Sequence, residues 1–338
     1  MLFCVPRVNI VMSMKNLLSV IQAPIKQDIE LFKEFYNAQL YSEIPLLGAA
    51  LQSVSASVGK MMRPMLLLLV SRACGNVSQE AYAAASSLEL LHTASLLHDD
   101  VVDESDMRRG RPSLNTLHGN RVAILTGDYL FSLALKNAAM TKNIEVIEQL
   151  SLLGCMLSSG EIIQLQTQRN SAYNEKNYFD IIKGKTASLF AACAYIGALA
   201  ADAPGELAAA LRRFGELIGI CFQVKDDIFD YYSSDIGKPT GSDMREGKIT
   251  LPAIYVLETS SSPVANAVKE KLAAGKELDE KEIELLIELS KNEGGVEYAL
   301  SKIEELRAEA LAVLPQSLSS DCREALVAYL DYAIQREK

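Results

Sequence analysis

Apolar side chains recur at spacings of three and four residues along almost the whole chain, and this pattern limits the fold more than any other feature. Such spacing gathers the apolar residues on one face of an α-helix. The strict alternation of a half-buried strand is nearly absent, and only 10 prolines are present to interrupt helices. Because 49% of the residues are apolar, the helices can also bury a large core. The sequence therefore predicts an all-α protein.

The predicted helices follow one another with short connections. Ser78 and the break at Pro204-Gly205 mark two of their starts. No fixed-period repeat and no low-complexity linker divides the chain, which favours a single domain over residues 14–338 after a disordered or extended segment at 1–13. The one long irregular stretch, 234–248, is expected to be functional, because long loops in compact helical proteins usually are. The predicted helices cover residues 15–23, 26–40, 44–57, 64–75, 78–104, 121–141, 143–169, 175–184, 186–202, 205–233, 249–259, 262–274, 279–290, 294–314 and 320–336.

The charge and the cysteines exclude some classes of protein. A net charge of −10, from 33 basic and 43 acidic residues, argues against a nucleic-acid binder, whose binding surface would be basic. A polyanionic substrate would instead need a metal ion or a local cluster of Lys and Arg. The 6 cysteines form no CxxC pair and are expected to be buried free thiols in a reducing, cytoplasmic compartment. The longest apolar run, 187–201, is too short to cross a bilayer, so we expect no membrane span.

An acidic segment follows directly on one of the apolar helical runs. Asp99 and Asp103 lie one helical turn apart and Asp100 is adjacent, so three carboxylates are crowded together. Repulsion and burial both make such a cluster costly, and a divalent cation relieves both. Mg²⁺ suits the cluster, because it uses few carboxylates and completes its coordination with phosphate oxygens of a substrate. Taken alone, the segment fits a solvated acidic face equally well.

The same pattern recurs in FQVKDDIFDYY, residues 222–232, as Asp226, Asp227 and Asp230. Two such motifs in one chain are rare by chance, and both follow long apolar helical runs. Two helices of this kind facing each other would form a carboxylate-lined mouth over an apolar shaft. That geometry suits a diphosphate with an apolar tail, with magnesium ions at the head and the tail in the core.

Basic residues gather near both motifs. VGKMMRP places cations at a predicted helix start beside Pro64, a position suited to anions. Gly184-Lys185-Thr186 resembles the end of a phosphate-binding P-loop, but the glycine which that motif requires falls at Phe179, so a P-loop is excluded. Isolated basic residues are usually surface charges, and only their position beside the Asp motifs favours a function. The candidates are Lys60, Arg63, Arg108, Arg109, Lys238 and Lys248.

The three histidines leave two interpretations open. His92 lies two turns before Asp99, so it is either a hydrogen-bonded core residue or a member of the same cavity. His98-Asp99 also spells the paired residues of metal-dependent phosphohydrolases. That enzyme class needs further His and Asp ligands, and this chain has few histidines to supply them.

The chain resembles the trans-type (head-to-tail) polyprenyl diphosphate synthases from about residue 25 to its end. LLHTASLLHDDVVDESDMRRGRPS is similar to the first Asp-rich motif of that family, and GICFQVKDDIFDYYSSDIGKPTGSDMREGKITLP to the second. GDYLF at 127–131 and GKTASLF at 184–190 also fit. The resemblance implies the isoprenoid synthase fold, with antiparallel helices around a central hydrophobic cavity, and a homodimer.

The resemblance also implies a reaction and its residues. Several Mg²⁺ ions would hold an allylic diphosphate, and isopentenyl diphosphate would be added to it repeatedly. The metal-binding residues implied are Asp99, Asp100, Asp103, Asp226, Asp227 and Asp230. The residues implied to contact the allylic diphosphate are Arg108, Lys185, Thr186, Gln223, Lys238 and Lys248, with Lys185 also catalytic. Those implied for isopentenyl diphosphate are Lys60, Arg63, His92 and Arg109.

One departure from the family and one pair of small residues qualify this picture. The family commonly reads GGKRxRP, whereas Val58 and Met61 stand here for a Gly and the first Arg, so an altered rim is expected around Lys60 and Arg63. Ala94 and Ser95 occupy positions that are often aromatic in short-chain members. They either leave the shaft open or merely allow close helix packing. An open shaft predicts a long product of the kind found in quinone side chains.

Other functions remain as alternatives. A shorter-chain geranylgeranyl or farnesyl diphosphate synthase would use the same motifs. A non-catalytic partner subunit would be expected to have lost the Asp motifs, which are intact here. A terpene cyclase would be expected to lack Lys60, Arg63 and Arg109, and a phosphohydrolase would release phosphate without isopentenyl diphosphate.

Overall fold

The computed structural model describes residues 13–57, 59–232 and 240–336, and it is almost wholly helical. The helices are α1 (Met14–Gln22), α2 (Lys26–Asn37), α3 (Pro45–Ala56), α4 (Met62–Cys74), α5 (Gln79–Val102), α6 (Leu114–His118), α7 (Asn120–Met140), α8 (Ile144–Arg169), α9 (Glu175–Ile182), α10 (Ser188–Leu199), α11 (Gly205–Phe229), α12 (Ser242–Arg245), α13 (Leu251–Thr259), α14 (Pro263–Ala273), α15 (Glu280–Asn292), α16 (Gly295–Val313) and α17 (Ser320–Gln335). A 3₁₀ turn, η1 (Ala23–Ile25), a π-helical segment, η2 (Lys183–Ala187), and a short hairpin, β1 (Met107–Arg108) and β2 (Arg111–Pro112), complete the elements.

The helix ends lie close to the predicted bounds because local side chains satisfy the terminal backbone groups. Ser78 caps α5 by accepting a hydrogen bond from the amide of Ala81, at 3.3 Å. Asp279 and Glu282 form a capping box at the start of α15. The sequence pattern did not predict α6, α12 or the hairpin, which are too short to carry a periodic signal. It also missed the π-helical turn of η2, which falls at the boundary of two predicted helices.

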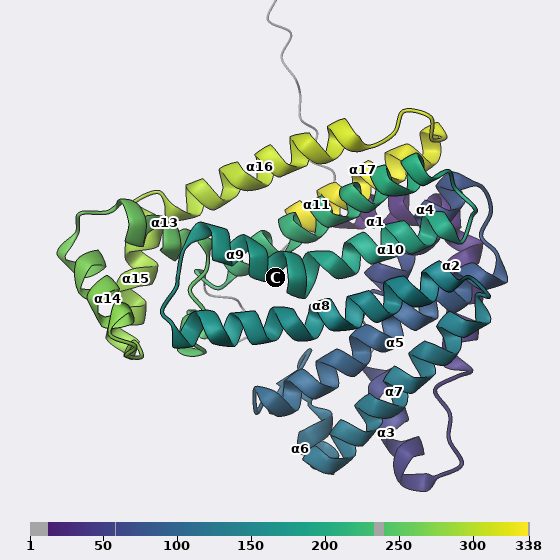
Figure 1. The fold of residues 1–338 in the computed structure, drawn as a ribbon, viewed down its shortest axis with the longest axis horizontal. Coiled ribbons are helices and arrows are strands. Elements are labelled where there is room, and N and C mark those ends of the chain that lie inside the picture. The colour runs from purple at the N-terminus through teal and green to yellow at the C-terminus, as the bar shows by residue number, and fades with distance from the viewer. Residues whose placement is uncertain (1–12, 58, 233–239, 337–338) are drawn as a thin grey trace, which may run out of the picture.

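Two long helices run through the interior and end at the Asp motifs. α5 packs along α7 and α4, and α11 packs on α10, η2 and α16 (Figure 1). η2 packs closely on α11 because Gly219 has no side chain. A Cβ on Gly219 would stand 2.5 Å from the Cα of Ala187 in η2. The interior therefore holds η2, and with it Lys185 and Thr186, directly against the helix of the second motif.

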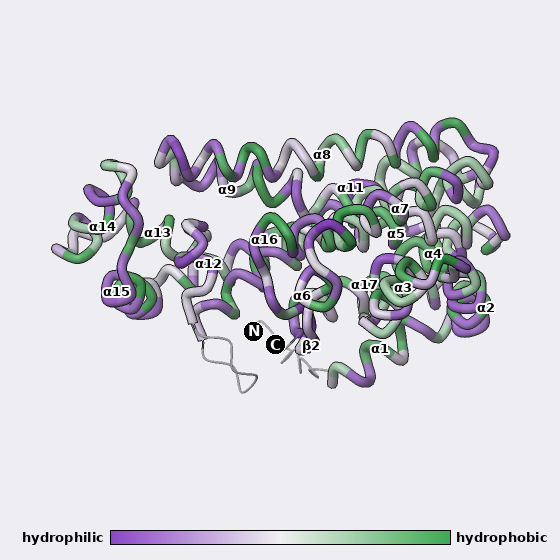
Figure 2. Tube along the Cα trace, turned by 90° about the horizontal axis from the view of Figure 1, so that it is seen from below, coloured by the Kyte–Doolittle hydropathy of each residue, from purple (hydrophilic) through white to green (hydrophobic). Residues whose placement is uncertain are grey.

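The face formed by α7 and α8 is unlike the rest of the surface. In Figure 2, α8 runs along the outer edge of the molecule with apolar and polar residues interspersed. Large apolar side chains of both helices are exposed on this face: Ile124, Leu125, Tyr129, Phe131, Leu135, Met140, Ile144, Leu152, Ile162, Ile163 and Leu165.

The structure differs from two expectations based on composition, that no segment could span a membrane and that the cysteines are buried. Among the described residues, α8 is the one helix long and apolar enough to cross a membrane, although length and composition alone are weak evidence. The cysteines described are free thiols; Cys193, Cys221 and Cys322 are buried, but Cys155 is exposed because it lies on the outward side of α8.

Candidate active site

The adjacent carboxylates of the first motif face in different directions. Burial raises the pKa of Asp99, near the end of α5, to about 6. The positive charge of Lys185 opposes this rise, while the negative charges of Glu161 and Asp103 add to it. Asp100 is buried and is ion-paired with the guanidinium of Arg108, whose Nε lies 2.8 Å from Oδ1. Asp99 is therefore turned towards η2 and α8, and Asp100 towards the hairpin.

The hairpin presents the paired arginines that follow the motif. Arg109 and Gly110 form its two-residue turn, with φ angles of 53° and 73°, as a turn of type I′ requires. The turn sends the Arg109 side chain back to α3, where Nη1 donates to the carbonyl of Ser57 at 2.9 Å. Gly59 leaves room for it, since a Cβ there would stand 2.7 Å from Nη1. The GKMMR stretch therefore begins with a glycine because any larger side chain there would collide with the Arg109 guanidinium.

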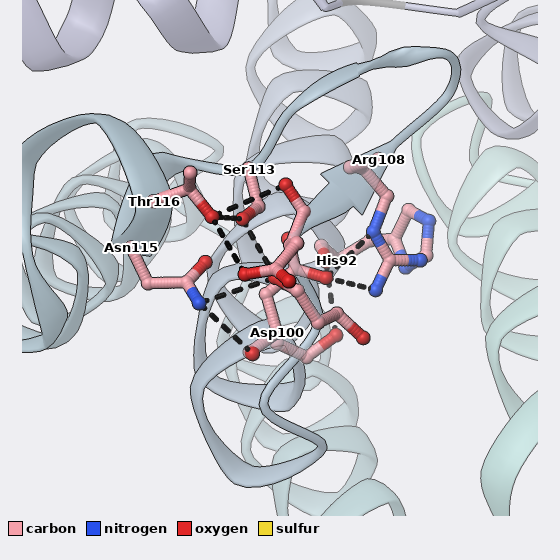
Figure 3. Close-up of polar contacts among 9 residues, drawn as sticks. His92, Asp100, Arg108, Ser113, Asn115 and Thr116 are labelled. Carbon is pink, nitrogen blue, oxygen red and sulfur yellow. Dashed lines mark hydrogen bonds and ion pairs between the residues drawn. The ribbon is translucent and has the colours of Figure 1, made fainter.

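Side chains at the start of α6 hold the loop between motif and hairpin, as Figure 3 shows. Ser113 donates to the carbonyl of Ser105 at 2.7 Å, and Asn115 donates to the same carbonyl at 3.2 Å. Thr116 donates to the carbonyl of Asp106 at 3.1 Å. These contacts fix the direction from which Arg108 reaches Asp100. The RPSLNT segment carries them, and the sequence analysis assigned it no such role.

Asp227 of the second motif is the centre of a buried hydrogen-bond network. Tyr178 of α9 donates to its Oδ2 at 2.5 Å, and Gln223 donates to its Oδ1 at 2.7 Å. Thr186 of η2 in turn donates to Gln223 at 2.7 Å. Burial, with a further contribution from Asp243, raises the pKa of Asp227 well above its ordinary value. The network joins three of the predicted residues and adds Tyr178, which the sequence analysis missed.

Asp230 and Asp226 have different surroundings from Asp227. Asp230 accepts the backbone amides of Ser242 and Asp243, each at 3.0 Å, and so holds the start of α12. Asp243 lines the adjacent cavity, and its pKa is raised to about 7, first by burial and then by Asp230. Asp226 is half exposed and is paired with Arg336 near the end of the chain. Asp243 stands in the GSDMREGK stretch, so its position after the second motif was the signal that could have found it.

Asp227 of the second motif lines a cavity of about 170 Å³, and two lysines of the same lining interact electrostatically with Asp99 and Asp103 of the first motif. Lys185 is paired with Glu161 and acts electrostatically on Asp99. Lys248 lines the cavity; burial lowers its pKa, but Glu246, Asp103 and Asp243 outweigh this and raise it. Lys248 thus links the loop after the second motif to the first. The cavity is lined by Gln164, Thr167, Gln168, Tyr173, Asn174, Tyr178, Ile181, Ile182, Lys185, Thr186, Gln223, Asp227, Asp243, Gly247, Lys248, Ile249, Thr250 and Ile254.

The residues predicted for isopentenyl diphosphate lie beside the first motif. A small cavity of about 40 Å³ brings His92 together with Arg108 and Arg109. The pKa of His92 is lowered well below its ordinary value, first by burial and then by Arg63, Arg109 and Arg108, so its ring is neutral near pH 7. Three arginines thus surround one neutral imidazole, and Asp100, which is paired with Arg108, lines the same cavity. Buried Glu89, also in this cavity, was missed by the sequence analysis.

Lys60 and Arg63 lie at the start of α4, and Arg63 interacts electrostatically with His92. The amine of Lys60 donates to the hydroxyl of Tyr332 in α17 at 2.7 Å. The guanidinium of Arg63 lies 5.4 Å from the centre of the Phe190 ring. Met61, at the position where the family commonly has an Arg, adopts a left-handed φ of 50° and begins α4. Val58 and Lys238 lie outside the described residues.

The side chains present fit a magnesium site that the substrate completes. The motifs offer only carboxylate oxygens, the ligands Mg²⁺ prefers, and burial has raised the pKa of Asp99, Asp227 and Asp243. Within residues 13–57, 59–232 and 240–336, no three His, Cys, Asp or Glu side chains converge on one metal position. A cation held by one or two carboxylates would take its remaining ligands from water and diphosphate oxygens, as Mg²⁺ characteristically does.

Comparison with known proteins identifies the family. The sequence matches the family described as polyprenyl synthetase over residues 44–289. The chain belongs to the polyprenyl synthetase family. Its membership confirms the predicted class of enzyme, a prenyltransferase.

Individual members of the polyprenyl synthetase family match almost the whole chain. The all-trans-nonaprenyl-diphosphate synthase (geranyl-diphosphate specific) of Rhodobacter capsulatus is 35% identical over 94% of this chain and 97% of its own. The octaprenyl diphosphate synthase of Escherichia coli is 32% identical over 89% of this chain and 93% of its own. The crystal structure of a geranylgeranyl pyrophosphate synthase from Bacteroides thetaiotaomicron is 43% identical, covers 95% of this chain and 100% of its own, and superposes with a TM-score of 0.82. The predicted isoprenoid synthase fold is thereby confirmed.

Proposed function

We propose that the chain is a long-chain trans-polyprenyl diphosphate synthase, which condenses isopentenyl diphosphate repeatedly onto an allylic diphosphate, and that its product serves as a quinone side chain. The observation that carries the proposal is a cavity lined by Asp227 of the second motif together with Lys185, Thr186, Gln223 and Lys248. Its two lysines interact electrostatically with Asp99 and Asp103 of the first motif. A separate cluster of Arg63, Arg109 and neutral His92 lies beside it. Two adjacent anion sites suit a reaction that brings two diphosphates together.

The residues of the first site act on the allylic diphosphate. Asp99, Asp100, Asp103, Asp226, Asp227 and Asp230 would hold Mg²⁺, which supplies positive charge for a departing diphosphate. Lys185 and Lys248 line the cavity where negative charge develops as the carbon–oxygen bond breaks, and they stabilise that charge. Arg108 supports them from the hairpin, and Lys238 is proposed to do so from the loop. Cleavage of the carbon–oxygen bond leaves an allylic carbocation. The lifetime of this cation depends on excluding water from the apolar side of the cavity.

The second site orients isopentenyl diphosphate. Lys60, Arg63 and Arg109 bind its diphosphate, and neutral His92 can donate a hydrogen bond without repelling their charges. This binding holds the double bond of isopentenyl diphosphate next to the carbocation. The barrier to carbon–carbon bond formation is lower because the two reacting groups are already in place. The released diphosphate accepts the proton lost afterwards, and no side-chain nucleophile takes part.

Incubation of the purified chain with Mg²⁺, farnesyl diphosphate and labelled isopentenyl diphosphate tests the proposal. A discrete long polyprenyl diphosphate is the expected product, and EDTA should abolish it. Folded protein that incorporates no label with Mg²⁺ present would point to a partner subunit, and release of inorganic phosphate alone would point to a hydrolase.

A shorter-chain geranylgeranyl diphosphate synthase is the second candidate. It is favoured by the 43% identity to the Bacteroides thetaiotaomicron structure, whose name gives that product. The small side chains at Ala94 and Ser95 favour the longer product. The length of the labelled product in the same assay distinguishes the two.

Replacing Ser95 with phenylalanine is expected to shorten the product by one or more isoprene units. Ser95 is partly exposed one turn from Asp99, whereas Ala94 is only 1% exposed and packed in the core. Ala94→Phe should also shorten the product, but overpacking should cost it about 1–3 kcal/mol of stability that Ser95→Phe does not lose. Product length is read by chromatography and stability by denaturation. Unchanged product length in both variants would contradict an open shaft at this level.

We further propose that the chain works in the cytoplasm as a homodimer in which a second copy covers the exposed face of α7 and α8. This face carries Leu125 and Ile162, which are 67% and 64% exposed. Polar residues such as Asp128 and Gln166 are interspersed along the same helices, which suits a protein partner better than lipid hydrocarbon.

Ile162→Glu is expected to convert the dimer to monomers, because it buries an unpaired charge at the contact. Sedimentation of the two proteins measures the effect. Leu300→Glu, at an exposed leucine of α16, is the matched control and should remain dimeric. A monomeric wild type would contradict the dimer, and flotation of the wild type with lipid vesicles would show that a membrane covers this face instead.

A further inference from the structure

The last helix touches both halves of the candidate site. Tyr332 of α17 accepts the hydrogen bond of Lys60, and Arg336 follows four residues later at the end of the helix. Four residues make about one helical turn, so both side chains lie on the same side of α17. One end of this helix therefore meets a residue proposed for isopentenyl diphosphate and a residue of the second Asp motif.

Arg336 is held against α11 by three contacts. Its Nη2 lies 3.0 Å from Oδ1 of Asp226 and donates to the carbonyl of Phe222 at 2.8 Å. Its guanidinium stacks 3.5 Å from the centre of the Phe222 ring. The side chain of Arg336 is 17% exposed, while that of Asp226 is 51% exposed. Phe222 thus holds the arginine in place, while the Asp226 carboxylate remains accessible from solvent.

Asp226 differs from the other carboxylates of its motif in what satisfies it. Asp227 accepts from neutral side chains, Tyr178 and Gln223, and Asp230 accepts from backbone amides. Such donors can remain while a carboxylate also binds a metal ion. A guanidinium on Asp226 instead supplies a full positive charge at the carboxylate, and a divalent cation approaching it meets electrostatic repulsion.

We propose that Arg336 is a positioning residue that holds Asp226 in the metal-free enzyme and competes with the divalent cation for that carboxylate. Binding of a metal ion at Asp226 then weakens the ion pair that holds Arg336 at the end of α17. This end of the helix lies one turn from Tyr332, the hydrogen-bond partner of Lys60. The inference rests on the proposed function, because it takes Asp226 as a metal-binding residue.

The test is a titration of the full-length protein with Mn²⁺ alone, followed by electron paramagnetic resonance of the free ion. Arg336→Gln is expected to bind Mn²⁺ about two- to five-fold more tightly, the range for losing a partly exposed ion pair. Arg336→Lys, which keeps the charge, should restore most of the wild-type affinity. In an Asp226→Asn background, Arg336→Gln should change the affinity little, since the carboxylate they compete for is gone.

Arg307→Gln is the matched control. Arg307 is paired with Asp331 of α17 at 2.8 Å, so the variant removes the same charge from a pair outside the site and should leave Mn²⁺ affinity unchanged. An unchanged or weaker affinity in Arg336→Gln would overturn the competition and mark Arg336 as structural. Absence of Mn²⁺ binding in both the wild type and Arg336→Gln would overturn it as well, because removing the arginine would then not open Asp226 to the ion. Failure of isopentenyl incorporation with the expected Mn²⁺ results would instead count against the proposed function alone.

Discussion

Asp99→Asn is expected to lower kcat/KM for isopentenyl incorporation by about 10²–10³-fold, the scale seen when one preorganised electrostatic group is lost from an active site. Asparagine keeps the size of the side chain but removes the charge that interacts with Lys185 of the cavity lining. The remaining charges then hold the metal and the diphosphate less firmly. Steady-state kinetics with labelled isopentenyl diphosphate at saturating allylic substrate measure the loss.

Asp180→Asn provides the control for this result. Asp180 is exposed on α9 and pairs with Lys176 at 2.6 Å, so the same chemical change is made outside the site. Both variants should keep the circular dichroism of the wild type. Asp99→Asn protein retaining a tenth or more of wild-type kcat/KM would remove Asp99 from the metal-binding set.

Gly219→Ala is expected to lower the free energy of unfolding by about 1–3 kcal/mol, because the interior has no room for an added methyl group. The new Cβ would stand 2.5 Å from the Cα of Ala187 and 3.0 Å from its Cβ, so η2 or α11 must move. Since η2 also carries Lys185 and Thr186, activity should fall together with stability. Denaturant unfolding and the incorporation assay measure the two effects.

Gly205→Ala makes the same substitution on the same helix where space is available. Nothing lies within 4 Å of a Cβ built on Gly205 at the first position of α11, so we expect unchanged or slightly higher stability. A Gly219→Ala protein as stable as the Gly205→Ala protein would show that η2 is free to shift away from α11.

The local features of the chain were largely predictable from sequence. The periodic apolar pattern predicted α5 and α11 within a few residues at each end, because burying one face requires that spacing. The two Asp motifs and the basic residues around them were identifiable as a site because they repeat a rare pattern beside apolar helices. Short elements such as α6, α12 and the hairpin at Arg109-Gly110 carried too few residues for a periodic signal.

The partners of each charge were decided by tertiary structure. Asp99 and Asp100 are neighbours in sequence, yet one faces Lys185 and the other is paired with Arg108, because α5 turns successive side chains in different directions. Tyr178 and Arg336 reach the second motif from α9 and from the end of the chain, at separations that no local pattern records. The sequence by itself determined the helices, the family and the carboxylates. Only the packing of distant helices decided which carboxylates lie open to a cation and which are already satisfied, because burial and charge act through space and not along the chain.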